Sequence, residues 1–443
     1  MAGIDGQPGG ARAMSGPGAP DLATDLTAAV DAVPPPVIAQ TMGEYWRTWL
    51  ARVRGGDAGA LPVVVALLAV TIVFTILSPN HVFLSPENLV NLFDQSAVFI
   101  VLAFGMGFVL LLGDIDLSIG YVAAIGGIVT AQLVQPTPNV PWPLAILAGL
   151  AVCALIGLLQ GSLVTRLRMP AFVVTLAGYL IWFGVMILLL GTAGGVGVTG
   201  SQANQQAIYG LVYGYIDPLI AWIGLVVIVA AFATVLWRRD AGRRRSGLVA
   251  PPLGLTIAKI VLVAIAGIIV VAICNVNRGR DLPIVGVPYV IPVVLLVLLA
   301  WTVLLERMQF GRHVYATGGN TEAARRAGIN VTTVRTMAFV LCSMTGGIVG
   351  IIYCSQLGGM TTNINGGQLV LYAVAAAVIG GTSLFGGRGR AMDGLLGGLV
   401  IGAIYNGLYL LGLPIQWQLI ITGLVLLAAV SVDSLSRKSS AHA

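Results

Sequence analysis

The chain has 443 residues, of which 57% are hydrophobic and only 9% are charged, and its mean hydropathy is +0.95. Soluble proteins are on average about 45–50% apolar and about 25% charged. This composition therefore excludes an ordinary cytoplasmic enzyme, a nucleic-acid-binding protein and a disordered scaffold. The net charge of +6 comes from 23 basic residues that stand in short clusters between long apolar runs, which is typical of membrane topology signals. We expect the solvent to be a lipid bilayer.

The N-terminal segment differs from the rest of the chain. Residues 1–45 are rich in Ala, Gly, Pro and Asp and have neither apolar periodicity nor a signal-peptide core, so they predict a disordered cytoplasmic tail. The stretch 44–54 follows with two Trp, one Tyr and three Arg, which indicates an anchor at the membrane interface. The four cysteines have no paired spacing, and we interpret them as small core residues.

The apolar runs predict an all-α polytopic membrane protein with a transmembrane domain over 46–438. About 20 apolar residues cross the hydrocarbon core as a helix. Twelve spans are expected, near 61–78, 90–112, 118–134, 143–164, 171–190, 216–237, 254–274, 288–305, 334–354, 369–382, 391–412 and 416–432. The run at 369–382 is short and ends in two glycines, so a broken or re-entrant helix is an alternative there.

The basic residues predict the orientation, because Lys and Arg near the membrane stay cytoplasmic. With both termini inside, 21 of the 23 basic residues lie on the cytoplasmic side, and only Arg278 and Arg280 lie outside. A shift by one span would scatter them. The expected topology is therefore a multi-pass membrane protein with cytoplasmic N- and C-termini.

Sequence motifs for catalysis are missing. The chain has no GxxxxGK[ST] phosphate-binding loop, no HExxH, no Cys/His cluster and no GxSxG, and its three histidines are isolated. We therefore expect no enzyme activity, no nucleotide hydrolysis and no metal site in this chain.

The longest hydrophilic stretch is 306–335, on the predicted cytoplasmic side. Within it, Thr321–Ala327 favours a short helix, with Asn320 or Thr321 as its N-cap and Gly328 as its end. A short helix that carries Glu322, Arg325 and Arg326 between glycines is suited to docking into the groove of another protein. The alternative is an amphipathic connector that lies on the lipid headgroups.

The string GRHVYATGGNTEAARRAGINV, in 311–331, makes a family resemblance specific. It resembles the loop of the coupling helix in permease subunits of ribose- and xylose-type monosaccharide ABC importers. GDIDLSIG (113–120), VIGGTSLFGGRGR (378–390) and the ending at 406–433 are similar to the same family. The resemblance runs from about residue 60 to 438, and the additional pair of spans at 216–274 resembles the xylose-type branch.

The resemblance implies ABC importer permease architecture and several partners. Two permease copies, as a homodimer in the bilayer, would form the pathway, an external binding protein would deliver the monosaccharide, and a separate cytoplasmic ATPase would bind ATP and Mg²⁺. This chain would bind no cofactor, and its substrate would be a xylose-like pentose. The resemblance also implies that the following residues form the element seated in the ATPase: Gly318, Gly319, Asn320, Glu322, Ala323, Arg325, Arg326 and Gly328.

Polar side chains within the spans are the candidates for the substrate pathway. Neutral amides offer both donors and acceptors, which suits a hydroxyl-rich neutral substrate, so we expect Gln95, Asn406 and Gln418 to face the pathway. The alternative for each is a hydrogen bond between helices, and for Gln160 that alternative is favoured.

Two loops between spans carry structural or gating candidates. In the first, Asp116 or Ser118 is expected to cap the following helix and Asp114 to close the turn, while a gating role near the ATPase and a cation site remain alternatives. The second, with Gly380 and Gly381, has a similar layout and suggests an internal repeat.

Two rival functions remain open from the residues alone. An ion-coupled or passive sugar transporter that works without an ATPase would need a buried carboxylate, and Asp94 is the candidate. A membrane-bound transferase would need a carboxylate or His constellation at a membrane face, for which GDIDLS alone is too little.

Overall fold

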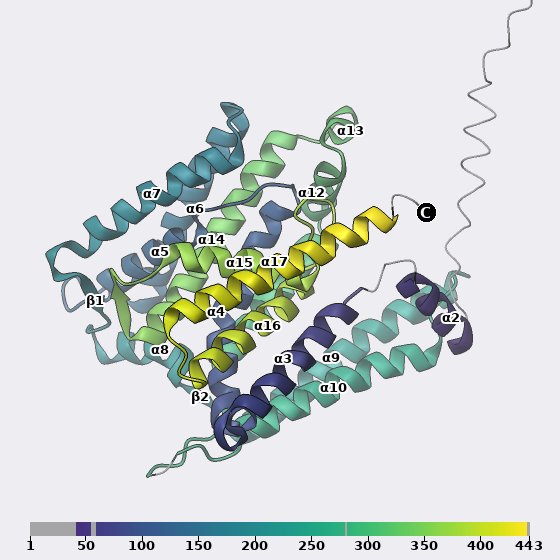
Figure 1. Ribbon diagram of the computed structural model, residues 1–443, viewed down its shortest axis with the longest axis horizontal. Coiled ribbons are helices and arrows are strands. Elements are labelled where there is room, and N and C mark those ends of the chain that lie inside the picture. Colours follow the sequence, from purple (N-terminus) through teal and green to yellow (C-terminus); the bar gives the residue numbers. More distant parts are fainter. Residues whose placement is uncertain (1–40, 55–58, 280, 441–443) are drawn as a thin grey trace, which may run out of the picture.

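The computed structural model describes residues 41–54, 59–279 and 281–440 and places a helix at each of the twelve predicted spans (Figure 1). Most of the predicted N-terminal tail lies outside the described residues. The twelve helices are α3 (Leu61–Leu77), α4 (Pro86–Leu110), α5 (Ile119–Leu133), α6 (Trp142–Arg166), α7 (Ala171–Leu190), α9 (Pro218–Arg245), α10 (Leu253–Cys274), α11 (Val290–Glu306), α14 (Val331–Leu357), α15 (Gly366–Gly380), α16 (Ala391–Leu410) and α17 (Ile415–Ser440).

The twelve helices at the predicted spans fall into three groups by length and apolarity. Seven of them (α4, α6, α7, α9, α10, α14 and α16) are each long and apolar enough to cross a membrane. Four are shorter apolar helices: α3, α5, α15 and the apolar first part of α17. The remaining one, α11, is bent by 68° against α12 (Gln309–Gly319). The chain is a polytopic helical membrane protein.

The sharpest bend within an apolar stretch does not lie at 369–382, where a broken helix was considered as an alternative. Helix α15 is short but continuous, and the sharp bend lies instead between α11 and α12. There the backbone of Gly311 approaches the carbonyl group of Leu305 so closely that a Cβ atom would collide with it. Glycine permits this approach because it has no side chain.

The core of the bundle lies around α4, α5, α14, α15 and α16. Helix α14 packs against α4, α5 and α6, and α16 packs against α4 and α15. Small residues at the crossings, among them Gly127 and Gly350, let these backbones approach. By contrast, α9 and α10 pack mainly against each other and lie at the edge of the bundle (Figure 1).

The two ends of the bundle carry different short elements. At one end, β1 (Gly195–Gly197) pairs with β4 (Gly359–Thr361), β2 (Tyr215–Ile216) pairs with β3 (Val287–Pro288), and α8 (Gln202–Tyr213) lies nearby. The opposite end carries α12 and α13 (Thr321–Arg326), together with α2 (Met42–Arg54) and the arginines that end α9 (Figure 1). We call the latter the basic end. The remaining described elements are the 3₁₀ helices η1 (Pro79–Leu84) and η2 (Gly191–Ala193).

Candidate functional site at the basic end

Helix α13 confirms the short helix predicted in the hydrophilic stretch. The Asn320 side chain accepts a hydrogen bond from the backbone N–H of Ala323 at 2.9 Å, as an N-cap does. Gly328, with φ of +83°, adopts the left-handed conformation just after the helix. Glu322 accepts hydrogen bonds from Arg325 at 3.0 Å and Arg326 at 3.3 Å, and all three side chains are exposed. The helix therefore presents a charged surface outside the bundle.

Helix α12 ends on two glycine turns that come from distant parts of the chain. A Cβ atom at Gly318 would collide with the carbonyl oxygen of Leu111, at the end of α4. The N–H of Gly387 donates to the same oxygen at 2.8 Å. Gly319 and Gly387 also lie side by side. We call the segments 111–113, 318–319 and 386–387 the glycine junction.

A further hydrogen bond holds α12 against the second of these turns. The Tyr315 hydroxyl donates to the carbonyl oxygen of Gly389 at 2.7 Å. Because the turns connect α4 to α5 and α15 to α16, α12 contacts the connections between four core helices. The similar layout noted for the two loops thus corresponds to a shared contact with α12.

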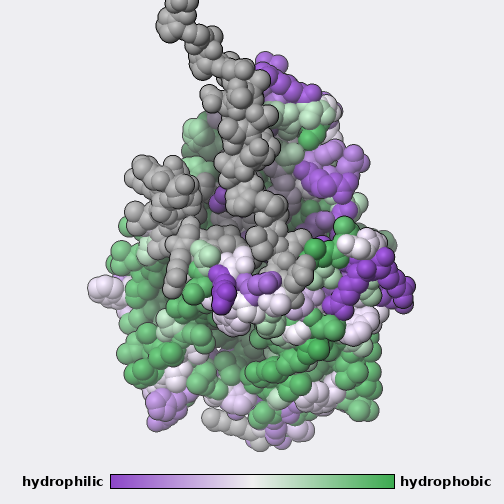
Figure 2. All heavy atoms as spheres, turned by 90° about the vertical axis from the view of Figure 1, so that its right-hand side faces the viewer, coloured by the Kyte–Doolittle hydropathy of each residue, from purple (hydrophilic) through white to green (hydrophobic). Residues whose placement is uncertain are grey.

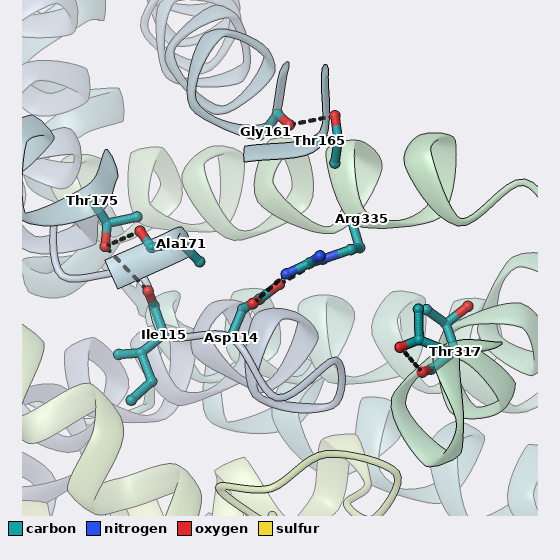
Figure 3. A network of polar contacts seen from close by, with 9 residues as sticks. Asp114, Ile115, Gly161, Thr165, Ala171, Thr175, Thr317 and Arg335 are labelled. Atoms are coloured by element: carbon teal, nitrogen blue, oxygen red, sulfur yellow. Dashed lines mark hydrogen bonds and ion pairs between the residues drawn. The ribbon is translucent and has the colours of Figure 1, made fainter. Parts of the chain in front are cut away.

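Asp114 forms a two-pronged ion pair with Arg335, one turn into α14 (Figure 3). The Arg335 Nη2 and Nε atoms lie 2.6 and 3.0 Å from the two carboxylate oxygens. The Asp114 side chain is only 9% exposed and that of Arg335 31% exposed, so solvent screens the pair weakly. The Asp114 backbone N–H donates to the carbonyl oxygen of Val109 at 3.0 Å and closes the turn after α4, while its carboxylate is used across the bundle. The pair connects the α4–α5 loop to the helix that follows α13.

Asp116 and Ser118 form a buried network beside this ion pair. Asp116 Oδ1 accepts hydrogen bonds from the backbone N–H and the hydroxyl of Ser118, at 2.9 and 2.7 Å. Ser118 also shares hydrogen bonds with the amide of Gln160 on α6, which confirms a link between helices for Gln160. Asp116 thus takes the capping role, whereas the Ser118 side chain makes no capping bond to α5. Burial raises the pKa of Asp116, and the hydrogen bonds from Ser118 and Cys342 offset part of the rise.

Threonines that sequence analysis did not single out complete the network (Figure 3). The Thr175 hydroxyl on α7 donates to the carbonyl oxygen of Ile115 at 3.2 Å. The Thr165 hydroxyl on α6 lies 3.0 Å from the hydroxyl of Thr336 on α14. Threonine is common in membrane helices and carries no charge, so its type alone gave no signal.

The predicted glycines of the second turn lie where helix α15 ends. Gly381, with φ of +117°, follows α15 in the left-handed region. Gly380 lies against the carbonyl group of Asp393, where a Cβ atom would not fit. The Asp393 carboxylate in turn accepts the backbone N–H of Arg390 at 2.7 Å and caps α16.

The three amides predicted for the pathway occupy different surroundings. Asn406 is buried and exchanges hydrogen bonds of 2.9 and 3.0 Å with Asn88, and it donates to Gln95 Oε1 at 3.1 Å. These contacts join α16 to α4. Gln418 lies elsewhere, at the start of α17, and donates to the carbonyl oxygen of Leu413 at 2.9 Å. The structure therefore brings Gln95 and Asn406 together and leaves Gln418 apart from them.

Acidic and metal-ligating residues are sparse inside the bundle. Within the described ranges, no group of three His, Cys, Asp or Glu side chains could hold a metal ion. Asp94, the carboxylate considered for ion coupling, is on α4, and Gln356 donates to its carbonyl oxygen at 2.6 Å.

Comparison with known proteins identifies the family. The family described as "Branched-chain amino acid transport system / permease component" matches residues 88–430, and the chain belongs to this family. It is 34% identical to the xylose transport system permease protein XylH of Escherichia coli, over 85% of this chain and 92% of that one. It is 32% identical to the ribose import permease protein RbsC of the same species, over 84% and 92%. The XylH protein of Haemophilus influenzae is 33% identical, over 85% and 97%. No solved structure matches the chain significantly.

Proposed function

We propose that this chain is the membrane-spanning subunit of an ATP-driven importer that carries a monosaccharide into the cytoplasm. The observation that carries the proposal is the glycine junction, through which one exposed helix pair contacts the ends of four core helices. Such an arrangement suits a subunit that is moved by another protein. The relatives named as xylose and ribose permeases support the same function.

In this proposal α12 and α13 seat in a groove of a separate ATPase subunit, which binds ATP and Mg²⁺. Gly318, Gly319, Asn320, Glu322, Ala323, Arg325, Arg326 and Gly328 are the residues proposed for that contact. Closure of the ATPase on ATP would displace α12 and α13, and the glycine junction would transmit the displacement to α4, α5, α15 and α16 as a rigid-body change. The ion pair of Asp114 with Arg335 would make α14 move together with the α4–α5 loop.

We propose that the basic end, with both termini, faces the cytoplasm of a bacterial cell. The clustering of arginines at that end supports this orientation. Since all four cysteines are buried, a new exposed cysteine can be labelled selectively. A membrane-impermeant thiol reagent on intact spheroplasts should label Ala203→Cys on α8 and spare Ala327→Cys after α13. Labelling of the second variant alone would contradict the orientation.

The substrate is proposed to be a xylose-like pentose. Although the family description names branched-chain amino acids, the relatives that match most of the chain carry the names of sugar permeases. A binding protein on the strand-bearing side would deliver the sugar between two copies of this chain. Gln95, Asn406 and Gln418 are proposed to face the pathway in the open state. Asn406 would then have to exchange its bonds to Asn88 and Gln95 for bonds to sugar hydroxyl groups.

Transport by a deletion strain that expresses variants of this chain tests the proposal. The strain should recover uptake of labelled xylose in preference to ribose, allose and leucine. Glu322→Gln should reduce uptake and weaken co-purification with the ATPase roughly tenfold, equivalent to about 1.4 kcal/mol of interface free energy. Asp281→Asn, an exposed acid at the other end, serves as the control and should behave as wild type. Normal uptake by Glu322→Gln with unchanged co-purification would contradict the coupling role, and recovery of leucine uptake alone would contradict the substrate.

A further inference from the structure

The ends of α9 and α10 at the basic end enclose a cavity that transport does not explain. The cavity measures about 170 Å³ and is lined by Trp237, Asp240, Ala241, Arg244, Leu253 and Thr256. It lies in the hairpin that packs least against the rest of the protein, since 6% of the apolar stretch of α9 and 11% of that of α10 are buried. The cavity therefore stands at the lipid-facing edge of the bundle.

The rim of this cavity is strongly positive. Arginines occupy five of the eight positions from 238 to 245, and Asp240 is the single acid among them. The two oxygens of Asp240 are already engaged, one by the Thr256 hydroxyl at 2.7 Å and the other by Arg239 Nε at 3.3 Å. The charge of Asp240 is thus balanced locally, and the four other arginines, all exposed, leave a net positive rim. Arg244 also donates to the carbonyl oxygen of Pro251 at 3.2 Å, which fixes it at the mouth of the loop.

The walls below the rim are apolar and open to the membrane. Trp237 is 56% and Leu253 46% exposed, although both are large hydrophobic residues. Exposed apolar residues continue along both helices, for example Val226 and Leu262. This surface is complementary to an anionic lipid. The positive rim matches the charged headgroup, and the apolar face below it matches the acyl chains.

Helix α2 brings further interfacial residues to the same place. The Met42 side chain lies next to Gly254 in the first turn of α10, where an added Cβ atom would meet it at van der Waals distance, and Figure 1 shows α2 beside the ends of α9 and α10. Trp46 and Trp49 on α2 contact each other edge to face with ring centroids 5.2 Å apart, and Trp is enriched at the membrane interface. On the face seen in Figure 2, hydrophilic residues gather in the upper and right-hand parts and hydrophobic residues flank the lower part. The tryptophans of α2 thus place interfacial residues beside the hairpin that holds the cavity.

We propose that this cavity binds the headgroup of an anionic phospholipid, with its phosphate at Arg244 and the adjacent arginines and its acyl chains along α9 and α10. The bound lipid joins the hairpin and α2 to the leaflet at the basic end. This takes the place of the protein contacts that the hairpin lacks. The binding is separate from transport, since none of these residues belongs to the glycine junction.

The test uses the full chain, purified in neutral detergent and titrated with phosphatidylglycerol or phosphatidylcholine, with bound lipid counted by native mass spectrometry. The wild type should retain phosphatidylglycerol selectively. The double variant Arg244→Gln with Arg245→Gln should bind it about thirtyfold more weakly, because each basic residue near an anionic lipid contributes about a factor of five. The matched control, Arg166→Gln at the end of α6 with Arg168→Gln in the following loop at the same end, should bind as wild type.

Two further arms keep the proposal falsifiable. Arg244→Lys, which keeps the charge, should retain most of the binding, and this variant also guards against loss of folding in the double variant. Millimolar inorganic phosphate should not displace the lipid. The proposal is overturned if the double variant binds phosphatidylglycerol as wild type does, if phosphatidylcholine binds equally well, or if phosphate alone displaces the lipid.

Discussion

Helices α4 and α9 are both long and apolar enough to cross a membrane, yet their surroundings differ greatly. In α4, 78% of the apolar stretch is buried inside the protein, against 6% in α9. The two most hydrophobic of the seven long spans among the described residues, α9 and α10, are also the two least buried. Hydropathy therefore identifies the contact with lipid, whereas small residues such as Gly127 and Gly350 identify the contact between helices. The core helices are held by close packing and hydrogen bonds to one another, whereas the α9–α10 hairpin mainly contacts lipid.

The largest expected effect comes from enlarging a core glycine. A Cβ atom at Gly350 on α14 would collide with the carbonyl oxygen of Ala123 on α5, so Gly350→Ala should cost about 3 kcal/mol by overpacking. Gly224→Ala on α9 meets nothing within 4 Å and should leave thermal stability in detergent unchanged or slightly raised. Equal melting temperatures for the two variants would contradict the distinction between core and hairpin.

The next effect comes from the ion pair at the basic end. Asp114→Asn leaves the Arg335 guanidinium without its charged partner, so it should cost about 2 kcal/mol in unfolding free energy. Sugar uptake should also fall, because α14 loses its link to the α4–α5 loop. The reversed pair, Asp114→Arg with Arg335→Asp, should regain part of both losses. Purely additive losses in the reversed pair would show that the two side chains do not act together.

The smallest effect is expected inside the hairpin. Thr256→Val removes the hydroxyl that donates to Asp240 and should cost about 1 kcal/mol. The change should speed hydrogen exchange in α9 and α10 without affecting the core. Thr234→Val removes a hydroxyl that bonds only to the backbone of its own helix, and it serves as the control. Faster exchange in α4 or α14 would mean that the hairpin is not an independent part.

The sequence predicted the helices well because long apolar runs without charges form helices in a bilayer. All twelve expected spans contain a helix, and Asn320 and Gly328 bound α13 as their cap preferences indicate. The spans and the caps of α13 depend on residues that are close in the sequence, so the local sequence is sufficient to predict them.

Contacts between distant residues could not be predicted in this way. Asp114 and Arg335 are separated by 221 positions, and the residues around one do not specify the other. The bend between α11 and α12 depends on how Gly311 meets Leu305, which hydropathy does not reveal. The pairing of Asn406 with Asn88 and Gln95 likewise depends on the packing of α16 against α4. Polar residue types indicated that these positions matter, but only the fold showed their partners.

The central claim, that this chain is moved by a separate ATPase, is tested most directly by transport in proteoliposomes. The purified chain alone should not accumulate labelled sugar, and ATP hydrolysis should be absent. Adding the ATPase subunit, the binding protein and ATP should produce uptake that stops when ATP is withheld. Accumulation of sugar by the chain alone, driven by an ion gradient and indifferent to the ATPase, would contradict the claim.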